Sequence, residues 1–352
     1  MRAQGGSRMT DDTFGSPTLD LATAPAALAD LLVRRRVPII AGYVVVTVLA
    51  RAAIGDLDRP AVLWWLVGLT ALSCAGATHG PRRFIMDWLP LAVIAAGYDT
   101  VRAQAPDLLG RAIVRPQLRF DEDVFGGTAP TVQLQRWLDV KPDQVHWWDY
   151  VAWIAYLSHF FVTLTVAAFL YVKNRALFKR LAALITTVSV AGFVTYFIIP
   201  AEPPWLASRH GALPPTSRVV HDIWTTLDLP SVAKVFNGDA KLANPVAALP
   251  SLHAAWPFML LLLLWPVLRR GRVVLLGYNA LMVFVLVYGA EHYVSDILLG
   301  WLYATVVFLA WNRYWVHRDH PAAGSQRARG RWLATRRDGD VSGRVRLRAR
   351  TP

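Results

Sequence analysis

Two histidines and one aspartate stand where long apolar runs begin, and residues of these types can do nucleophilic and acid–base chemistry. His292 and Asp296 are four residues apart at the start of the last apolar run, so a helix there places both on one face. A carboxylate so placed orients the imidazole, fixes its tautomer and raises its basicity. His253 stands at the start of an earlier apolar run. Because polar groups are costly at membrane depth, we expect all three residues to have a function there.

Phosphoryl transfer through a histidine is a reaction that these residues could carry out. It needs a neutral imidazole as the nucleophile, a carboxylate behind it, a second imidazole that protonates the leaving oxygen, and cations for the other phosphate oxygens. His292 and Asp296 can supply the first two and His253 the third, so we expect the two histidines to face each other across a phosphate. Pro250 suits the first position of a helix, and the free N–H groups after it, with the hydroxyl of Ser251, would point at the anion.

Other roles stay open for the same residues. His292 and Asp296 could form a structural hydrogen-bonded pair, and His253 could be a helix-capping or satisfied histidine. A metal site would need a third ligand at a recognisable spacing, which the sequence lacks, so we predict no metal and no other cofactor. The residues that could serve as that ligand are His210, His221, Asp222 and Asp239. His159 lies in the middle of an apolar run, and we interpret it as a buried imidazole bonded to a neighbouring helix.

The composition indicates the kind of protein that positions these residues. The 352 residues are 55% hydrophobic, and the apolar residues come in runs long enough to cross a bilayer. The net charge of +13 would suit nucleic acid in a soluble protein, but here Lys and Arg lie beside the apolar runs, as they do in membrane proteins. The single cysteine, Cys74, excludes an internal disulfide. We therefore predict a membrane-embedded protein with no nucleic-acid partner.

The apolar runs predict an all-α polytopic fold with about eight transmembrane helices. The expected spans are 37–54, 60–78, 84–101, 147–172, 181–200, 250–268, 273–290 and 293–313. We divide the chain into a cytoplasmic tail, two accessory helices, a six-helix catalytic core and a basic cytoplasmic tail. These parts are residues 1–36, 37–80, 81–316 and 317–352.

The short loops predict which way the chain faces. The turns after spans two, four and six are basic, at Arg82–Arg83, 173–180 and 269–272, and both tails are basic next to the membrane. The positive-inside rule places all of these in the cytoplasm. The two histidines at the helix starts then lie at the extracytoplasmic face of the plasma membrane, together with the loops at 103–145 and 201–249.

Two of these motifs resemble a known family. Pro250-Ser251-Leu252-His253, followed after about forty residues by His292-Tyr-x-x-Asp296, resembles the second and third signature motifs of the phosphatidate phosphatase type 2 superfamily. With the segment 201–205 (Ala-Glu-Pro-Pro-Trp), it looks like the branch that contains fungal inositol phosphorylceramide synthase. The resemblance covers roughly residues 85–316 and implies a six-helix core, a metal-independent phosphohistidine intermediate and a lipid phosphate substrate. It implies that His292 is the nucleophile, Asp296 its orienting partner and His253 the acid.

The cationic motifs of that superfamily are missing here. A Lys followed by Arg-Pro is not found, and Val285-Leu286 stands where the family has Ser-Arg. Phosphate-binding groups must therefore come from elsewhere, and the alternative for each arginine is a side chain that extends to lipid headgroups. The candidates are Arg102 with Tyr98 and Asp99 at the end of the third span, then Arg218 and Lys241 in the outer loop.

These observations predict a lipid phosphotransferase that acts at the extracytoplasmic face. A phosphodiester headgroup carries one negative charge and needs fewer cations than a monoester, which favours transfer to an alcohol over hydrolysis. The resemblance suggests inositol phosphate as the transferred group. A lipid phosphate phosphatase is the alternative. A transporter of an anionic or lipid-linked substrate is a second alternative, although neither an inverted repeat nor paired broken helices is apparent.

Overall fold

The computed structural model describes residues 68–70, 72, 74, 80–141, 144–227 and 244–319. These residues form helices and two isolated backbone bridges, without a sheet, which confirms the predicted all-α class. The long helices are α3 (Gly80–Ala103), α7 (Trp147–Lys173), α8 (Arg175–Ile198), α12 (Leu252–Leu264), α13 (Arg272–Tyr288) and α14 (Val294–Asp319). The predicted helix at 37–54, most of the one at 60–78 and nearly all of both tails lie outside the described residues.

The six long helices fall where the six-helix core was predicted, but they differ in length. Three are long and apolar enough to cross a membrane: Arg82–Ala103, Arg175–Ile198 and Val294–Arg318. Helix α7 adds a fourth if its two halves, which meet at an angle of 44°, form one span. Helices α12 and α13 are apolar but shorter. The described residues thus account for three or four spans by length and composition, and the total of eight stays a prediction.

Polar side chains fix where three of these helices begin. Asn174 accepts a hydrogen bond from the backbone N–H of Leu177 at 3.1 Å at the start of α8. Asp149 accepts one from the backbone N–H of His146 at 2.7 Å at the start of α7. Ser251 does the same for α12. Such caps satisfy N–H groups that have no partner within the helix.

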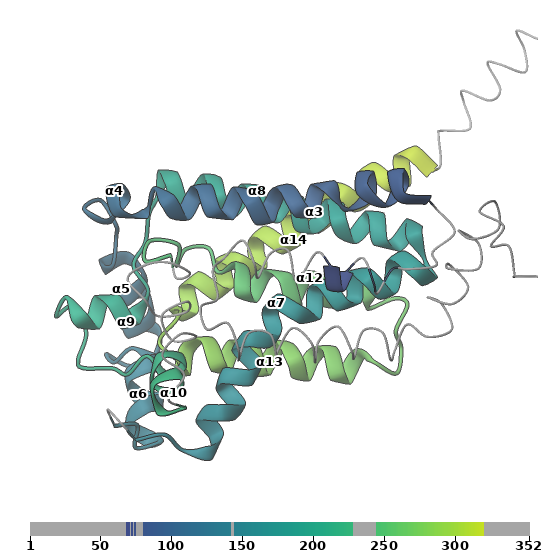
Figure 1. Cartoon of the computed structure of the whole chain (residues 1–352). Helices are drawn as coiled ribbons and strands as arrows, with labels where there is room; N and C mark the ends of the chain where they lie inside the picture. The colour runs from purple at the N-terminus through teal and green to yellow at the C-terminus, as the bar shows by residue number, and fades with distance from the viewer. Residues whose placement is uncertain are drawn as a thin grey trace, which may run out of the picture. The chain divides into compact units, whose positions relative to one another are not determined.

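The loops predicted to be too polar to cross the membrane fold into short helices at one end of the long ones (Figure 1). They are α4 (Ala105–Leu109), α5 (Arg115–Val124), α6 (Pro130–Trp137), α9 (Pro204–Arg209) and α10 (Val219–Thr226). At the other end Arg175 donates two hydrogen bonds to Asp87, at 2.6 and 2.9 Å, and so ties the first turns of α8 to α3. The short helices therefore lie at only one end of the long helices, and this is the end where the histidines lie.

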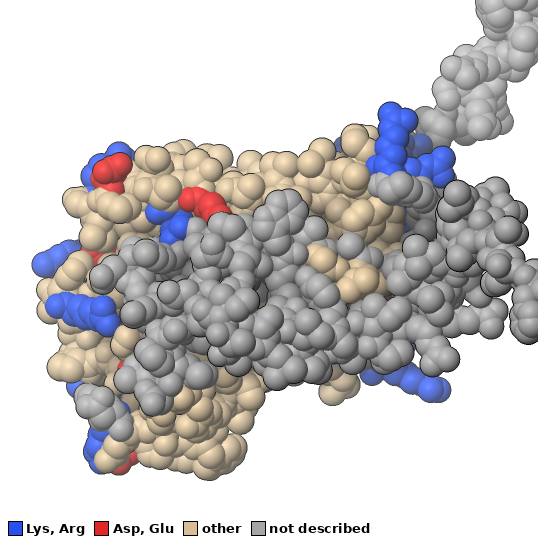
Figure 2. All heavy atoms as spheres, in the orientation of Figure 1, with Lys and Arg blue, Asp and Glu red and all other residues tan. Residues whose placement is uncertain are grey.

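Large apolar side chains cover the outside of the long helices. On α14, Leu298, Leu302, Val306 and Leu309 recur at helical spacing and are 45–59% exposed. In Figure 2, most Lys and Arg of the described residues lie toward the two ends, and the described surface that is visible between them is mainly formed by other residues. In water such a surface would be costly, whereas lipid tails cover it at no cost. The pattern supports a multi-pass membrane protein.

Helix α12 lies inside the bundle, where it packs on α7, α8, α13 and α14. Met259 and Leu260 are almost completely buried, which explains why α12 is apolar on every side. Its first turn approaches α14 very closely. A Cβ at Gly300 would overlap the backbone carbonyl oxygen of Ser251, so only glycine allows this contact. The position of His253 is therefore fixed against the helix that follows His292.

Candidate active site

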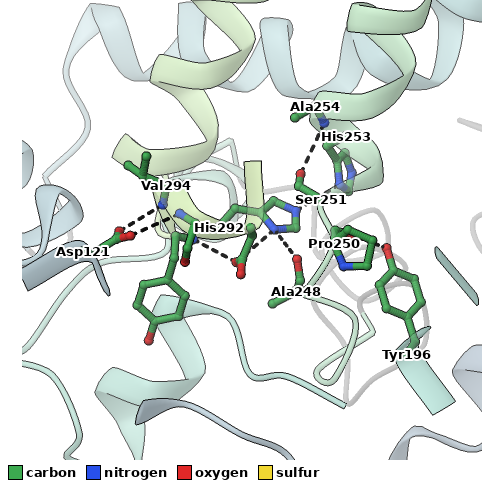
Figure 3. Close-up of polar contacts among 12 residues, drawn as sticks. Asp121, Tyr196, Ala248, Pro250, Ser251, His253, Ala254, His292 and Val294 are labelled. Atoms are coloured by element: carbon green, nitrogen blue, oxygen red, sulfur yellow. Dashed lines mark hydrogen bonds and ion pairs between the residues drawn. The ribbon is translucent and has the colours of Figure 1, made fainter. Parts of the chain in front are cut away.

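The ring of His292 is held by two acceptors on the same nitrogen. Its Nδ1 lies 3.0 Å from the backbone oxygen of Ala248 and 3.5 Å from Oδ2 of Asp296 (Figure 3). A carbonyl oxygen only accepts, so Nδ1 carries a hydrogen, and in the neutral ring Nε2 then has the lone pair. The side chain of His292 is 4% exposed and Asp296 is fully buried. This is the tautomer that a nucleophilic Nε2 requires.

His253 faces the free nitrogen of His292. Its Nδ1 lies 3.4 Å from Nε2 of His292, so the structure brings together the two histidines that the sequence singled out. The expectation that they face each other across a phosphate needs correction. Attack on phosphorus alone needs a separation of about 3 Å from the nucleophile, so no phosphate fits on the line between these atoms. The phosphate must bind beside the pair, or with the two rings further apart.

The start of α14 is held from two directions. Oδ2 of Asp296 accepts the backbone N–H of Tyr293 at 3.0 Å. The carboxylate of Asp121, on α5, accepts the N–H groups of Val294 and Ser295 at 2.9 and 3.1 Å (Figure 3). Burial raises the pKa of Asp121 to about 6, although these two N–H bonds act in the opposite direction. Sequence reasoning missed Asp121, which lies 173 positions before its nearest partner.

The segment before α12 differs from the expectation for Pro250 and Ser251. Helix α12 begins at Leu252, and Ser251 is its N-cap, whose hydroxyl oxygen accepts the N–H of Ala254 at 3.2 Å. The backbone N–H of Ser251 donates to the backbone oxygen of Asp296 at 3.0 Å, so it does not point at an anion. Ser251 is fully buried and acts as a cap, and its role in substrate binding stays a prediction.

The carbonyl that holds His292 is itself fixed by the segment at 201–205. Ala201 donates to the backbone oxygen of Val246 at 2.9 Å and accepts the N–H of Ala248 at 3.1 Å. Further along the same segment, the N–H of Trp205 donates to the backbone oxygen of Ala290 at 3.0 Å. In the sequence, this segment was noted for its resemblance to a family. Its backbone thus connects the segment at 246–248 with Ala290, two residues before His292.

Arg218 is the predicted cation that the structure places in this buried region. Its Nε and Nη2 donate to the two carboxylate oxygens of Glu291, at 2.7 and 3.1 Å. Its guanidinium lies 4.5 Å from the centre of the Trp205 ring. Burial opposes the charge of Arg218, but the negative charge of Glu291 and its hydrogen bonds outweigh this and raise the pKa of Arg218. Glu291, next to His292, was not among the predicted site residues.

Of the other predicted substrate contacts, one is near this ion pair. Tyr98, on α3, is close enough to Arg218 and Glu291 to interact with their charges. Asp99 and Arg102 lie in the last turns of the same helix, and their roles as substrate contacts stay predictions. Lys241 lies outside the described residues, so nothing can be said of its position.

His159 is bonded to a neighbouring helix, as the sequence suggested. Its ring donates to the backbone carbonyl of His253 on α12. That carbonyl has no partner within the helix, because the residue four positions later is Pro257, which lacks an N–H. The ring of His159 also lies 4.5 Å from that of His253, and Tyr156 stacks on His253 at 5.0 Å. These two residues of α7 hold the His253 ring in place.

One of the residues considered as a metal ligand, His210, has a carboxylate partner of its own. His210 pairs with Glu202, with Nδ1 3.0 Å from the carboxylate, on the outer helix α9. Within the ranges that the structure describes, no three His, Cys, Asp or Glu side chains are arranged to hold a metal ion. Asp239 falls outside those ranges.

Comparisons with known proteins show the family of the chain. A family model described as "PAP2 superfamily" matches residues 119–310, more than half of the chain, including both histidines and Asp296. The chain is also similar to a Bacteroides thetaiotaomicron protein named phosphoinositol dihydroceramide synthase. The two are 27% identical over 236 residues, which cover 62% of this chain and 73% of that protein. No solved structure matches the chain significantly.

Proposed function

This chain belongs to the PAP2 superfamily, and from that premise we propose that it is a membrane lipid phosphotransferase that works through a phosphohistidine at His292. Family membership and the synthase relative support an enzyme that acts on lipid phosphate groups. They leave the transporter hypothesis without support. The name of the relative suggests a phosphoinositol headgroup as the transferred group.

The observation that carries the proposal is the set of contacts at the two ring nitrogens of His292. Its Nδ1 donates to Ala248 and faces Asp296, so the lone pair of Nε2 is directed toward His253. A nucleophile therefore lies beside an acid in a buried site, with a carboxylate behind the ring that stabilises the positive charge that develops on it. A structural pair would not need a second imidazole at the free nitrogen.

The reaction follows from this arrangement in two steps. In the first, Nε2 of His292 attacks phosphorus, the bond to the lipid alcohol breaks, and His253 gives its proton to the departing oxygen. In the second, an acceptor alcohol gives a proton to His253 and attacks the phosphohistidine, which returns both rings to their starting state. Arg218, whose charge acts on His253, and Tyr98, which interacts with Arg218, are the groups that we propose to bind the other phosphate oxygens. We place this site at the extracytoplasmic face by the positive-inside rule.

Trapping the intermediate tests the proposal. Purified protein is incubated separately with phosphatidylinositol, phosphatidate and polyprenyl phosphate that carry a radiolabelled phosphate, and acid-labile label on the protein is measured. We expect label at His292 in the wild type and none in His292→Ala, with turnover reduced by about a thousandfold or more. His210→Ala, which changes a histidine outside the cluster, should be labelled like the wild type. Full turnover in folded His292→Ala would end the phosphohistidine mechanism.

The same experiment separates a transferase from a phosphatase. Both enzymes form the same intermediate, and they differ only in whether an alcohol or water removes the phosphoryl group. With a lipid alcohol present, a transferase yields a new phospholipid, whereas a phosphatase yields a free phosphate ester at the same rate with or without the alcohol. We expect the phospholipid.

A further inference from the structure

The ion pair of Arg218 and Glu291 gives the phosphate site an unusual charge balance. The pair is bidentate, with N–O distances of 2.7 and 3.1 Å, and its side chains are 12% and 7% exposed. Trp205 covers one face of the guanidinium. The charge of Arg218 is therefore matched by a full negative charge in the same buried region before any substrate arrives. Screening by water is weak there, so this balance strongly affects which anions can enter.

The pair is joined to the catalytic histidines on both sides. Glu291 immediately precedes His292 in the chain. Arg218 bonds the hydroxyl of Tyr156, whose ring stacks on His253 at 5.0 Å. The charge of Arg218 is also close enough to act on His253. An ion that binds at the two histidines therefore meets Arg218 and Glu291 together.

The guanidinium keeps donors for such an ion. Glu291 takes two of its five N–H groups and Tyr156 a third, so these contacts use three of the five donors that a guanidinium carries. Two N–H groups on a cation whose charge is already matched can bind one phosphate oxygen with one negative charge. They cannot compensate a second charge, because each unit of negative charge added in a buried site is also repelled by Glu291.

We propose that Glu291 determines the substrate class, so that the site accepts singly charged phosphodiesters and discriminates against doubly charged phosphomonoesters. The proposal rests on the phosphohistidine function, since it concerns the phosphate that His292 attacks. The carboxylate acts through Arg218 and by direct repulsion, and it takes no proton in the reaction. Glu291 is a specificity-determining residue in this scheme and not a catalytic one.

Two lipids with one leaving group test the proposal. Phosphatidylinositol and phosphatidate both release diacylglycerol when the phosphorus–oxygen bond to that alcohol breaks, but the first is a diester and the second a monoester. At about pH 7.5 most phosphatidate carries two charges, since the second ionisation of a phosphate monoester lies near pH 6. Single-turnover release of diacylglycerol with excess enzyme measures both reactions without dependence on the acceptor.

We expect the wild type to prefer the diester, and Glu291→Gln to lower the ratio of diester to monoester rates by about tenfold or more. Glu202→Gln is the matched control, because it removes one negative charge from a carboxylate that is 6% exposed and pairs with His210 instead. Its ratio should equal that of the wild type. An unchanged ratio in folded Glu291→Gln overturns the proposal. So does a wild type that prefers phosphatidate, although label at His292 would then leave the phosphohistidine mechanism standing.

A measurement on the wild type alone covers the case in which Glu291→Gln does not fold. Phosphatidate and phosphatidylmethanol, a diester with one charge at every pH used, are compared as inhibitors of phosphatidylinositol turnover. Between about pH 5.5 and pH 8, phosphatidate gains its second charge, so we expect its inhibition to weaken about tenfold relative to phosphatidylmethanol. Equal strength of both inhibitors across this range contradicts the proposal. Absence of both label and diacylglycerol with every lipid would instead defeat the proposed function itself.

Discussion

In His292, a backbone carbonyl and a carboxylate both contact one ring nitrogen and together orient the ring. The Ala248 oxygen is nearer to Nδ1 than the Asp296 carboxylate is, by 3.0 Å against 3.5 Å. The carbonyl can therefore keep the hydrogen on Nδ1 alone. What the carboxylate adds is a negative charge, which stabilises the ring when Nε2 bonds to phosphorus and the imidazole becomes positive.

Because the carbonyl sets the tautomer and the carboxylate only supplies charge, we expect Asp296→Asn to lose part of the catalytic rate. The tautomer survives through Ala248, and the asparagine oxygen can still cap Tyr293, so the nucleophile keeps its lone pair. Without the charge, phosphohistidine formation should slow by about 10- to 100-fold, which rapid-quench labelling measures. His292→Ala should give no label at all. If Asp296→Asn were as inactive as His292→Ala, the carbonyl would not suffice to hold the ring.

Asp121 provides a prediction for the dependence of stability on pH. Burial raises its pKa from 3.8 to about 6 in the folded protein. Between these values the folded protein holds a proton that the unfolded chain has released, so stability falls as pH rises through this window and is constant above it. A shift of about two pKa units limits this contribution to about 3 kcal/mol.

The matched variant for this effect is Asp121→Asn, which cannot titrate. The Tm of the wild type minus that of the variant should decrease between about pH 4 and pH 6 and stay level at higher pH. Thermal melts in detergent at several pH values give this difference, and effects of other groups cancel in it. A difference that does not change with pH would show that Asp121 keeps its ordinary pKa.

The residues that sequence could identify are those with a local signal. His292 and Asp296 share a helix face, and His253 begins an apolar run, so spacing and the cost of burying polar groups point to them. Asp121, Glu291 and the Ala248 carbonyl act through partners far away in the chain or through the backbone. No spacing rule reveals such contacts, because they depend on how the loops pack.

At the scale of elements, the long helices were predictable and their ends were not. The expected span 250–268 is helix α12 at Leu252–Leu264, because Ser251 caps it and uses its own N–H in a bond to Asp296. The loop at 103–145 contains three short helices, and the sequence pattern indicated an amphipathic piece at only one of them, α6. Packing against the long helices stabilises short helices that would be marginal alone, and hydropathy does not report that.

The contact between α14 and α12 predicts the effect of a single methyl group. In Gly300→Ala the new Cβ would overlap the Ser251 carbonyl, so the start of α12 must shift and carry His253 with it. A displacement of about 1 Å can lower the rate by about 100-fold. Gly277→Ala is the control, since its Cβ meets nothing within 4 Å on exposed α13. Turnover rates and thermal melts are measured for both variants. Equal activity of the two variants would mean that the contact adjusts without moving His253.

For the whole molecule, the two ends of the bundle allow a test of orientation. One end carries the short helices and the histidines, and the other carries the basic turns, such as the one at 269–272. In a Cys74→Ser background, Asp123→Cys on α5 and Arg270→Cys in that turn each add one exposed thiol. If the positive-inside rule holds, a maleimide that cannot cross membranes labels Asp123→Cys in intact cells and labels Arg270→Cys only after lysis. The reverse pattern would place the histidines in the cytoplasm, and the lipid phosphate would then have to come from the inner leaflet.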